Sequence, residues 1–205
     1  MALRLERHLA SAGHTTVAIV RNPDHSRDVQ AAGAEPLVCD LEATDVDAVA
    51  AHLEGADAVV FAAGAGPGSG IPRKQTVDRD ASVLMAEAAE RAGVRRFVQI
   101  SSMGAGAPPR PGTDETFAAY LRAKTEAEDD LRRRDLDWTV LRPGGLTNAP
   151  ATGRVRLAAS VPRGQVSRDD VAAVIVGLLS QARGIGQTLE LVTGDTPIEQ
   201  ALAAE

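Results

Sequence analysis

Short, almost continuously apolar segments alternate along the chain with longer segments in which apolar residues recur at helical spacing. Apolar runs of this kind are typical of strands that are covered on both faces of a sheet. They span Thr16–Val20, Pro36–Cys39, Ala58–Ala62, Arg96–Ser101, Trp138–Leu141 and Thr188–Val192. The longer segments predict helices at Leu3–Ala12, Asp24–Ala32, Val46–Leu53, Thr76–Ala92, Glu115–Arg134 and Arg168–Gln181.

Three glycines separate predicted helices from the strands that follow them. Gly13, Gly33 and Gly93 stand where a residue in the left-handed conformation ends a helix. The alternation of strands and helices predicts an α/β fold, a doubly wound parallel sheet with helices on both faces. The 205 residues contain no repeat or linker, which favours one domain over residues 1–205. Its last part, from about residue 146 to 205, is expected to lie on the substrate side.

Composition narrows the class of protein. The hydrophobic fraction of 44% and the charged fraction of 24% are those of a folded globular chain. A net charge of −6 argues against a nucleic-acid partner. No apolar run approaches the ~20 residues of a membrane span, so we expect no membrane partner and a cytoplasmic protein. One cysteine, Cys39, and four scattered histidines predict neither a disulfide nor a metal site.

Short motifs close the predicted strands or begin the helices after them. In chain order they are Val20-Arg21-Asn22-Pro23, Cys39-Asp40-Leu41, Phe61-Ala62-Ala63-Gly64-Ala65-Gly66, Val98-Gln99-Ile100-Ser101-Ser102, Tyr120-Leu121-Arg122-Ala123-Lys124, Leu141-Arg142-Pro143-Gly144-Gly145-Leu146-Thr147 and Val166-Ser167-Arg168-Asp169-Asp170-Val171-Ala172. In order and spacing, the series resembles the atypical short-chain dehydrogenase/reductases of the NAD(P)H-binding or NmrA-like group, which are close to the NAD-dependent epimerase/dehydratases. The resemblance covers nearly the whole chain and implies a Rossmann-like fold that binds NAD(P).

The chain departs from that family at its beginning. The family's first strand and its G-x-x-G-x-x-G turn, which brings a helix N-terminus to the cofactor pyrophosphate, have no counterpart before the helix Leu3–Ala12. The missing strand would lie beside Thr16–Val20, and its absence would leave a gap of ~10 Å with unpaired backbone groups. A start codon assigned too late explains this departure, and a truncated or degenerate protein is the alternative.

Tyr120 and Lys124 carry the strongest chemical signal. They lie four residues apart on a predicted helix and therefore share a face. An ammonium beside a phenol favours the phenolate, so Tyr120 is a candidate general acid or base. The resemblance implies that Lys124 also binds the nicotinamide ribose. An incidental surface pair is the alternative, although the chain has one Tyr and only two Lys.

Ser102 is the match to the family's catalytic Ser or Thr, at the carboxyl end of a strand, where α/β proteins bind ligands. Its hydroxyl can hold a substrate oxygen while Tyr120 transfers the proton. Ordinary turn chemistry explains a serine there equally well. The asparagine that completes the family's tetrad has no clear match in Thr76–Ala92, and the acidic run after Lys124, residues 126–130, is predicted to be a solvated helix face.

Arg21 indicates which nicotinamide cofactor the protein prefers. At the end of this strand an acid binds the ribose 2′-OH, whereas an arginine accommodates a 2′-phosphate, so NADP is favoured over NAD. A solvated arginine is the alternative. The resemblance places Asp40 and Leu41 on the adenine side, although Asp40 could instead cap a helix.

The resemblance also implies cofactor contacts closer to the nicotinamide. The residues concerned are Ala63, Gly64, Ser101, Lys124, Pro143 and Gly144. A flexible loop after Phe61 and a structural turn at Pro143-Gly144 are the alternatives.

Three functions follow as hypotheses. The first is an NADP-dependent oxidoreductase or epimerase-like enzyme on a small carbonyl or sugar-like substrate. The second is a non-catalytic NAD(P)H-binding redox sensor of NmrA type, favoured by the missing asparagine and by the short region after Leu146. The third is a remnant without ligand. A small-molecule substrate and a homodimer are the expected partners.

Overall fold

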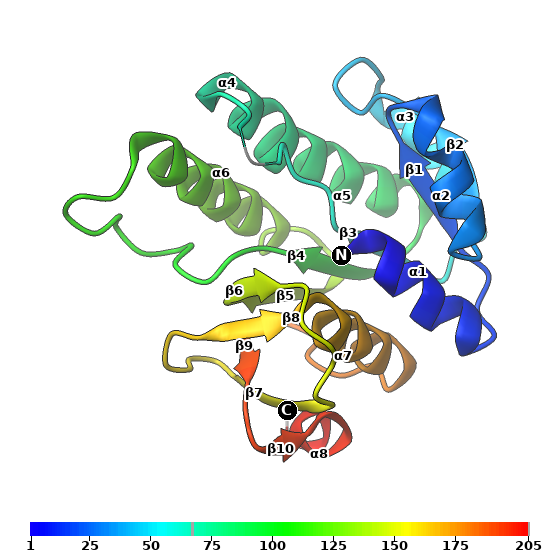
Figure 1. Cartoon of the computed structure of the whole chain (residues 1–205). Coiled ribbons are helices and arrows are strands. Elements are labelled where there is room, and N and C mark those ends of the chain that lie inside the picture. Colours follow the sequence, from blue (N-terminus) through cyan, green and yellow to red (C-terminus); the bar gives the residue numbers. More distant parts are fainter. Residues whose placement is uncertain (67, 205) are drawn as a thin grey trace.

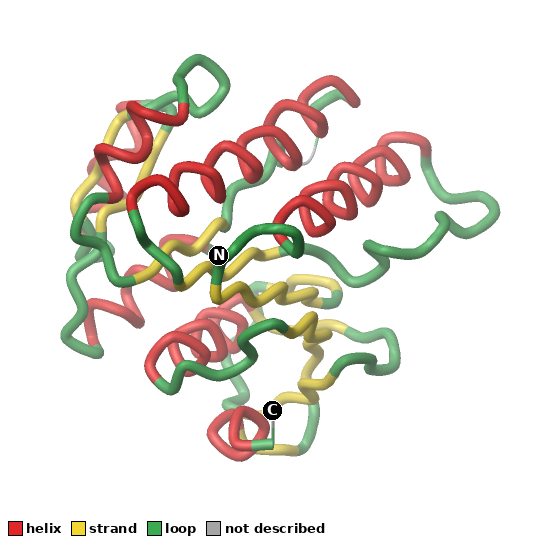
Figure 2. Tube along the Cα trace, turned by 180° about the vertical axis from the view of Figure 1, so that it is seen from behind, coloured by secondary structure: helices red, strands yellow, loops and turns green. Residues whose placement is uncertain are grey.

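The computed structural model describes residues 1–66 and 68–204, which form a three-layer α/β arrangement (Figure 1). Its larger sheet has six strands in the order β10-β7-β9-β5-β4-β3. The parallel part consists of β3 (Ala58–Phe61), β4 (Arg96–Ile100), β5 (Asp137–Pro143) and β9 (Gln187–Thr193). Seen from behind, its strands run through the middle of the molecule between helices (Figure 2). The predicted fold class is confirmed.

Two further strands form a sheet of their own. β1 (Val17–Val20) pairs in parallel with β2 (Glu35–Val38), and neither is hydrogen-bonded to the larger sheet. Ile19 packs against the apolar cluster beside β3, whereas Val17 and Val38 are more than half exposed. Within residues 1–66 and 68–204, no strand is hydrogen-bonded to both β1 and β3, so the two sheets share no ladder.

Helices bury apolar residues on both faces of the larger sheet. On one face, α1 (Ala2–Ser11), α7 (Arg168–Ser180) and α8 (Ile198–Ala203) share a core with β5 and β9. On the other, α3 (Val46–Leu53), α5 (Ala81–Ala92) and α6 (Glu115–Leu131) pack with β3 and β4. In the described part of the chain, no helix is long and apolar enough to cross a membrane.

Local sequence signals explain where several of these helices begin and end. The side chains of Asp45, Asp114 and Ser167 accept hydrogen bonds from backbone N–H groups in the first turns of α3, α6 and α7. Gly93 ends α5 with a φ of +72°, a conformation that costs glycine little. Gly33 has a φ of +90°, and a Cβ there would lie 2.7 Å from the Cβ of Ala10.

The structure corrects some predicted elements. The predicted helix Thr76–Ala92 is two elements, the π-helix η2 (Lys74–Asp80) and α5. The predicted helix Asp24–Ala32 begins with the 3₁₀-helix η1 (Pro23–His25), because Asn22 caps it, and continues as α2 (Ser26–Ala31). Arg134 lies beyond the end of α6.

The larger sheet is parallel over β3, β4, β5 and β9, and antiparallel strands extend it at one side. β7 (Arg154–Ala158) runs antiparallel to β9, and β10 (Thr196–Pro197) runs antiparallel to β7. A small third sheet joins β6 (Gly145–Thr147) to β8 (Gln165–Ser167). These strands escaped prediction because they are short or, like β7, have exposed arginines between buried residues instead of a continuous apolar run.

Candidate active site

Lys124 is anchored where β3 and β4 end. It projects from α6, and its Nζ lies 3.3 Å from Asp78 Oδ1 in η2. The same ammonium donates to the carbonyl oxygens of Ile100 at 3.2 Å and Ala63 at 3.5 Å. Only 3% of Lys124 is exposed. Burial lowers its pKa, and the negative charge of Asp78 acts in the opposite direction.

Tyr120 lies one helical turn before Lys124, between two lysines. The Nζ atoms of Lys124 and Lys74 are 5.9 and 5.5 Å from the centre of its ring. Burial raises the pKa of Tyr120, while a hydrogen bond with the side chain of Ser102 lowers it. The structure therefore brings together the three residues that the sequence singled out as an acid–base centre, Ser102, Tyr120 and Lys124. Their roles remain a prediction.

The π-helix η2 supplies two residues that the sequence analysis missed. Asp78 is 1% exposed, and its Oδ2 accepts from the backbone N–H of Ala65 at 3.3 Å. Lys74 is 7% exposed and donates to the carbonyl oxygen of Gly66 at 2.9 Å. Together they hold the segment that follows β3. The rarity of lysine, with only two in the chain, is the one sequence signal that could have drawn attention to Lys74.

Ser101 faces the protein interior next to the candidate centre. Its Oγ donates to Glu128 Oε1 at 2.5 Å, and Glu128 also accepts from Arg142 Nε at 2.9 Å and Arg132 Nη2 at 2.7 Å. Glu128 has no exposed surface. The prediction that the acidic run is a solvated helix face is therefore wrong at Glu128, because two arginines and a serine compensate its charge. It holds at Glu126 and Asp129, which are exposed.

Arg21 lies at the carboxyl end of β1 and is bound to Glu42. Their side chains are 2.9 Å apart, and Glu42 Oε2 also accepts from Arg73 at 2.7 Å. Glu42 Oε1 accepts from Thr76 Oγ1 at 2.5 Å. These contacts lower the pKa of Glu42, with the hydrogen bond from Thr76 as the largest cause. Glu42 thus links the end of β1 to α4 (Ile71–Arg73) and η2.

Asp40 and Leu41 follow β2 at the same edge. The Oδ1 of Asp40 accepts from the backbone N–H of Glu42 at 3.0 Å and so shapes a turn. The alternative that Asp40 caps a helix is wrong, because Asp45 caps α3. Leu41 packs against the apolar cluster around α3 and α5.

Pro143 and Gly144 end β5 beside the segment that follows Ser102. The carbonyl oxygen of Pro143 accepts from the backbone N–H of Met103 at 3.0 Å. A Cβ at Gly144 would overlap the carbonyl oxygen of Gly164. The turn therefore has a structural role, and the predicted contact with a cofactor is an additional role that stays a prediction.

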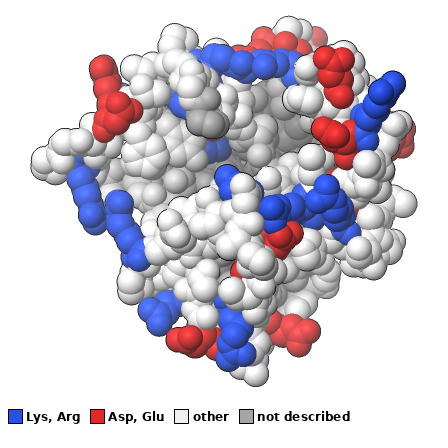
Figure 3. All heavy atoms as spheres, viewed as in Figure 1, with Lys and Arg blue, Asp and Glu red and all other residues white. Residues whose placement is uncertain are grey.

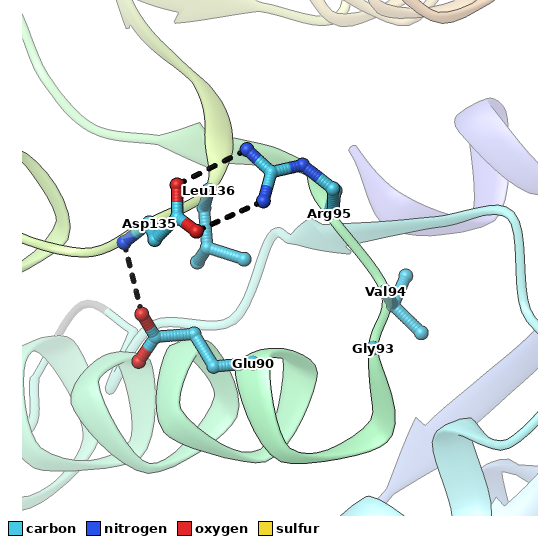
Figure 4. A pocket seen from close by; sticks show the side chains of 6 residues that line it. All are labelled: Glu90, Gly93, Val94, Arg95, Asp135 and Leu136. Atoms are coloured by element: carbon cyan, nitrogen blue, oxygen red, sulfur yellow. Dashed lines mark hydrogen bonds and ion pairs between the residues drawn. The ribbon is translucent and has the colours of Figure 1, made fainter.

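A pocket of about 290 Å³ lies at the opposite edge of the sheet, at the amino ends of β4 and β5 (Figure 4). It is lined by Glu90, Gly93, Val94, Arg95, Asp135 and Leu136. Two hydrogen bonds of 3.1 Å join Arg95 to Asp135, and Glu90 accepts from the backbone N–H of Asp135. Its charged groups already bind one another, and ligands of parallel α/β sheets bind at the carboxyl edge. The candidate centre around Tyr120 lies at that carboxyl edge.

The carboxyl edge fits a nicotinamide cofactor. Ala63, Gly64 and Gly66 expose their backbone there, and small residues allow a ligand to approach it closely. A Cβ at Gly64 would lie 3.0 Å from Asp78 Oδ1, so a larger residue would crowd the centre. Figure 3 shows this face hollowed below α4 and α6, with basic side chains inside the hollow and at its rim.

The fold and the site define a nucleotide-binding α/β protein of the oxidoreductase and epimerase type. Residues 1–182 match the family described as NAD(P)H-binding, and the chain belongs to that family.

Relatives support this assignment over almost the whole chain. The "Uncharacterized sugar epimerase YhfK" of Bacillus subtilis is 37% identical over 92% of this chain and 87% of its own. The structure of a putative NAD-dependent epimerase/dehydratase from Bacillus halodurans has a TM-score of 0.90 and 36% identity, covering 100% of this chain and 94% of that one. The anaerobillin reductase ChuY from Escherichia coli O157:H7 has a TM-score of 0.78 and 26% identity, covering 94% and 91%.

Proposed function

We propose that the protein is an NADP-dependent oxidoreductase or epimerase-like enzyme that acts on a small carbonyl or sugar-like substrate. The observation that carries the proposal is the position of Tyr120. The Nζ of Lys124, on the next turn of the same helix, lies 5.9 Å from the centre of the Tyr120 ring, and Ser102 follows β4 at the same carboxyl edge of the sheet. This is the arrangement that a general acid or base requires.

The three side chains would each have a separate role in the reduction of a carbonyl substrate. Ser102 and Tyr120 donate hydrogen bonds to the carbonyl oxygen and polarise the C=O bond. A nicotinamide cofactor held at this edge would supply the hydride for the carbonyl carbon. Tyr120 gives its proton to the oxygen, so an alcohol forms and a phenolate remains. The ammonium of Lys124 stabilises that phenolate until solvent returns the proton.

The preference for NADP over NAD rests on Arg21. A 2′-phosphate is an acceptor for a guanidinium fork, and Arg73 provides a second fork at the same carboxylate of Glu42. Asp40 and Leu41 would flank the adenine. Ala63, Gly64, Ser101, Pro143 and Gly144 stay predicted contacts of the nicotinamide half, with Lys124 on its ribose.

Two features favour a redox sensor as the second candidate. Asp78 pairs with Lys124 and thereby competes with Tyr120 for the ammonium on which acid–base chemistry depends. Burial also raises the pKa of Tyr120, which keeps the phenol protonated. Both features suit a protein that binds the cofactor without turning over a substrate.

Two measurements test these candidates. A fluorescence titration with NADPH distinguishes a binding protein from a remnant that binds no ligand. Turnover is then measured with quinones, aldehydes and sugar nucleotides. The proposal that the protein is an enzyme requires activity on at least one of these substrates, and Tyr120→Phe should remove that activity. Binding without turnover on any of them favours the sensor. The homodimer and the cytoplasmic location are further parts of the proposal, which sedimentation and cell fractionation test.

A further inference from the structure

Lys74 is a buried cation without an acidic partner. It begins η2, is 7% exposed, and its one hydrogen-bond acceptor among the described residues is the carbonyl oxygen of Gly66. No carboxylate in residues 1–66 and 68–204 forms an ion pair with it. Burying an ammonium that no opposite charge compensates is costly. The buried charge of Lys74 therefore suggests a role in the chemistry of the neighbouring residues.

The other lysine near Tyr120 has a different environment. Lys124 shares its charge with Asp78 and with two backbone carbonyl oxygens. Asp78 lies four residues after Lys74 in the same π-helix, yet its carboxylate faces Lys124. Short π-helices occur frequently at functional sites. Of the two ammonium groups beside Tyr120, Lys74 thus has the charge that no carboxylate neutralises.

We propose that Lys74 is a second cation of the acid–base centre, a positioning residue that stabilises the phenolate of Tyr120 after its proton has left. Its Nζ lies 5.5 Å from the ring centre, slightly closer than that of Lys124 at 5.9 Å. The inference rests on the proposed function and deepens it. Asp78 then holds Lys124 in place, and Lys74 provides the net positive charge.

The groups that face Tyr120 come from three segments. Lys74 and Asp78 belong to η2, Lys124 to α6, and Ser102 to the segment after β4. Asp78 raises the pKa of Tyr120 and the hydrogen bond with Ser102 lowers it. In general, a unit charge about 6 Å from a phenolate oxygen, at an effective dielectric constant between 20 and 80, lowers the pKa of the phenol by roughly 0.5 to 2 units.

The chain offers a direct measurement, because Tyr120 is its one tyrosine. Expression with 3,5-difluorotyrosine labels this position alone and brings its ionisation toward neutral pH, where the folded protein can be titrated. Fluorine NMR then follows the phenol in the protein without cofactor or substrate. The same titration is made with Lys74→Met, Lys74→Arg and the control Arg122→Met, which removes an exposed cation two residues from Tyr120.

The proposal predicts a rise of about one unit in the phenol pKa for Lys74→Met, most of which Lys74→Arg restores, and no comparable change for Arg122→Met. If Lys74→Met does not fold, as judged by circular dichroism, Lys74→Gln replaces it. An unchanged pKa, or an equal rise in Lys74→Arg, would overturn the proposal. Because the titration needs no turnover, an inactive protein would refute the proposed function and leave this test intact.

Discussion

Asp78 and Lys124 form an ion pair with 3.3 Å between Oδ1 and Nζ, and the two side chains are 1% and 3% exposed. The pair joins η2 to α6, and its lysine Nζ lies 5.9 Å from the centre of the Tyr120 ring. A buried charge that loses its partner costs about 3–5 kcal/mol, so this contact fixes the two elements relative to each other. It also decides how much of the lysine's charge the phenol experiences.

Asp78→Asn should lower the pKa of Tyr120 and destabilise the fold. The carboxylate raises the pKa of the phenol, so its removal leaves Lys124 free to stabilise the phenolate. The uncompensated ammonium should lower the free energy of unfolding by about 3 kcal/mol. Titration of the fluorinated tyrosine and urea denaturation measure the two effects. Asp129→Asn, at an exposed position of α6, is the control. Equal effects in both variants would contradict a specific role of Asp78 in pairing with Lys124 beside Tyr120.

Tyr120→Phe should remove most of the catalytic activity and leave NADPH binding intact. The substitution keeps the ring and removes the proton, and loss of a general acid or base costs ~10²-fold or more in rate. NADPH affinity, measured by fluorescence, should stay within a factor of about two of the unchanged chain. A variant that turns over substrate at the original rate removes Tyr120 from the mechanism and favours the sensor.

Arg21 and Glu42 should shift the cofactor preference in opposite directions. Arg21→Ala should reduce the affinity for NADPH roughly ten-fold more than the affinity for NADH, because a hydrogen bond to a charged group contributes about 1.5–3 kcal/mol. Glu42→Gln should strengthen NADPH, because Glu42 competes with a 2′-phosphate for Arg21 and Arg73. Arg27→Ala, exposed on α2, is the control. Equal losses of both cofactors in Arg21→Ala would rule out a 2′-phosphate site.

Glu6→Gln should stabilise the protein at pH 7 and not at acidic pH. Burial raises the pKa of Glu6, and the nearby side chain of Thr16 acts in the opposite direction as the smaller cause. The folded chain thus holds this proton more tightly than the unfolded chain. Its stabilising effect is complete below the unfolded pKa near 4.5 and is lost as pH rises through the folded pKa.

At pH 7 the ionised carboxylate opposes folding, so the neutral amide should raise the melting temperature by ~2–4 °C, which corresponds to roughly 1 kcal/mol. The difference between the two chains should shrink as pH falls through the folded pKa of Glu6 and should be gone below about 4.5. Glu35→Gln, at an exposed position of β2, should show neither effect. A gain that is the same at pH 4 and pH 7 would point to a cause other than ionisation.

A strand supplied between β1 and β3 should join the two sheets. Their facing edges form no ladder within residues 1–66 and 68–204, and unpaired edges favour self-association. An upstream extension of about a dozen residues, a strand of ~5–6 and a Gly-rich turn, should raise both the melting temperature and NADPH affinity. An extension of equal length made of Gly and Ser should do neither. A 205-residue chain that already melts cooperatively as a monomer and binds NADPH at micromolar concentration would contradict this expectation.

Periodicity and chain order were enough to predict the main elements of the fold. Continuous apolar runs predicted β1 to β5 and β9 because both faces of a parallel sheet are covered, which leaves no polar face to interrupt the run. Asp45 and Gly93 mark helix ends through their own backbone chemistry. Tyr120 and Lys124 share a face of α6 because four residues make about one helical turn. Each of these relationships is local, so the sequence by itself determined it.

The tertiary structure decided which charges meet. Lys74 and Asp78 reach Tyr120 and Lys124 only because η2 packs against α6, about 45 residues further along the chain. Glu128 belongs to an acidic run that suggests a solvated face, yet it is buried and bound by Ser101, which follows β4, and by Arg142 of β5. A carboxylate is stable in solvent and equally in a buried site where arginines compensate its charge. Residue type alone therefore does not show whether a carboxylate is solvated or buried. The neighbouring side chains decide this, and they come close to the carboxylate only when the sheet and its helices assemble.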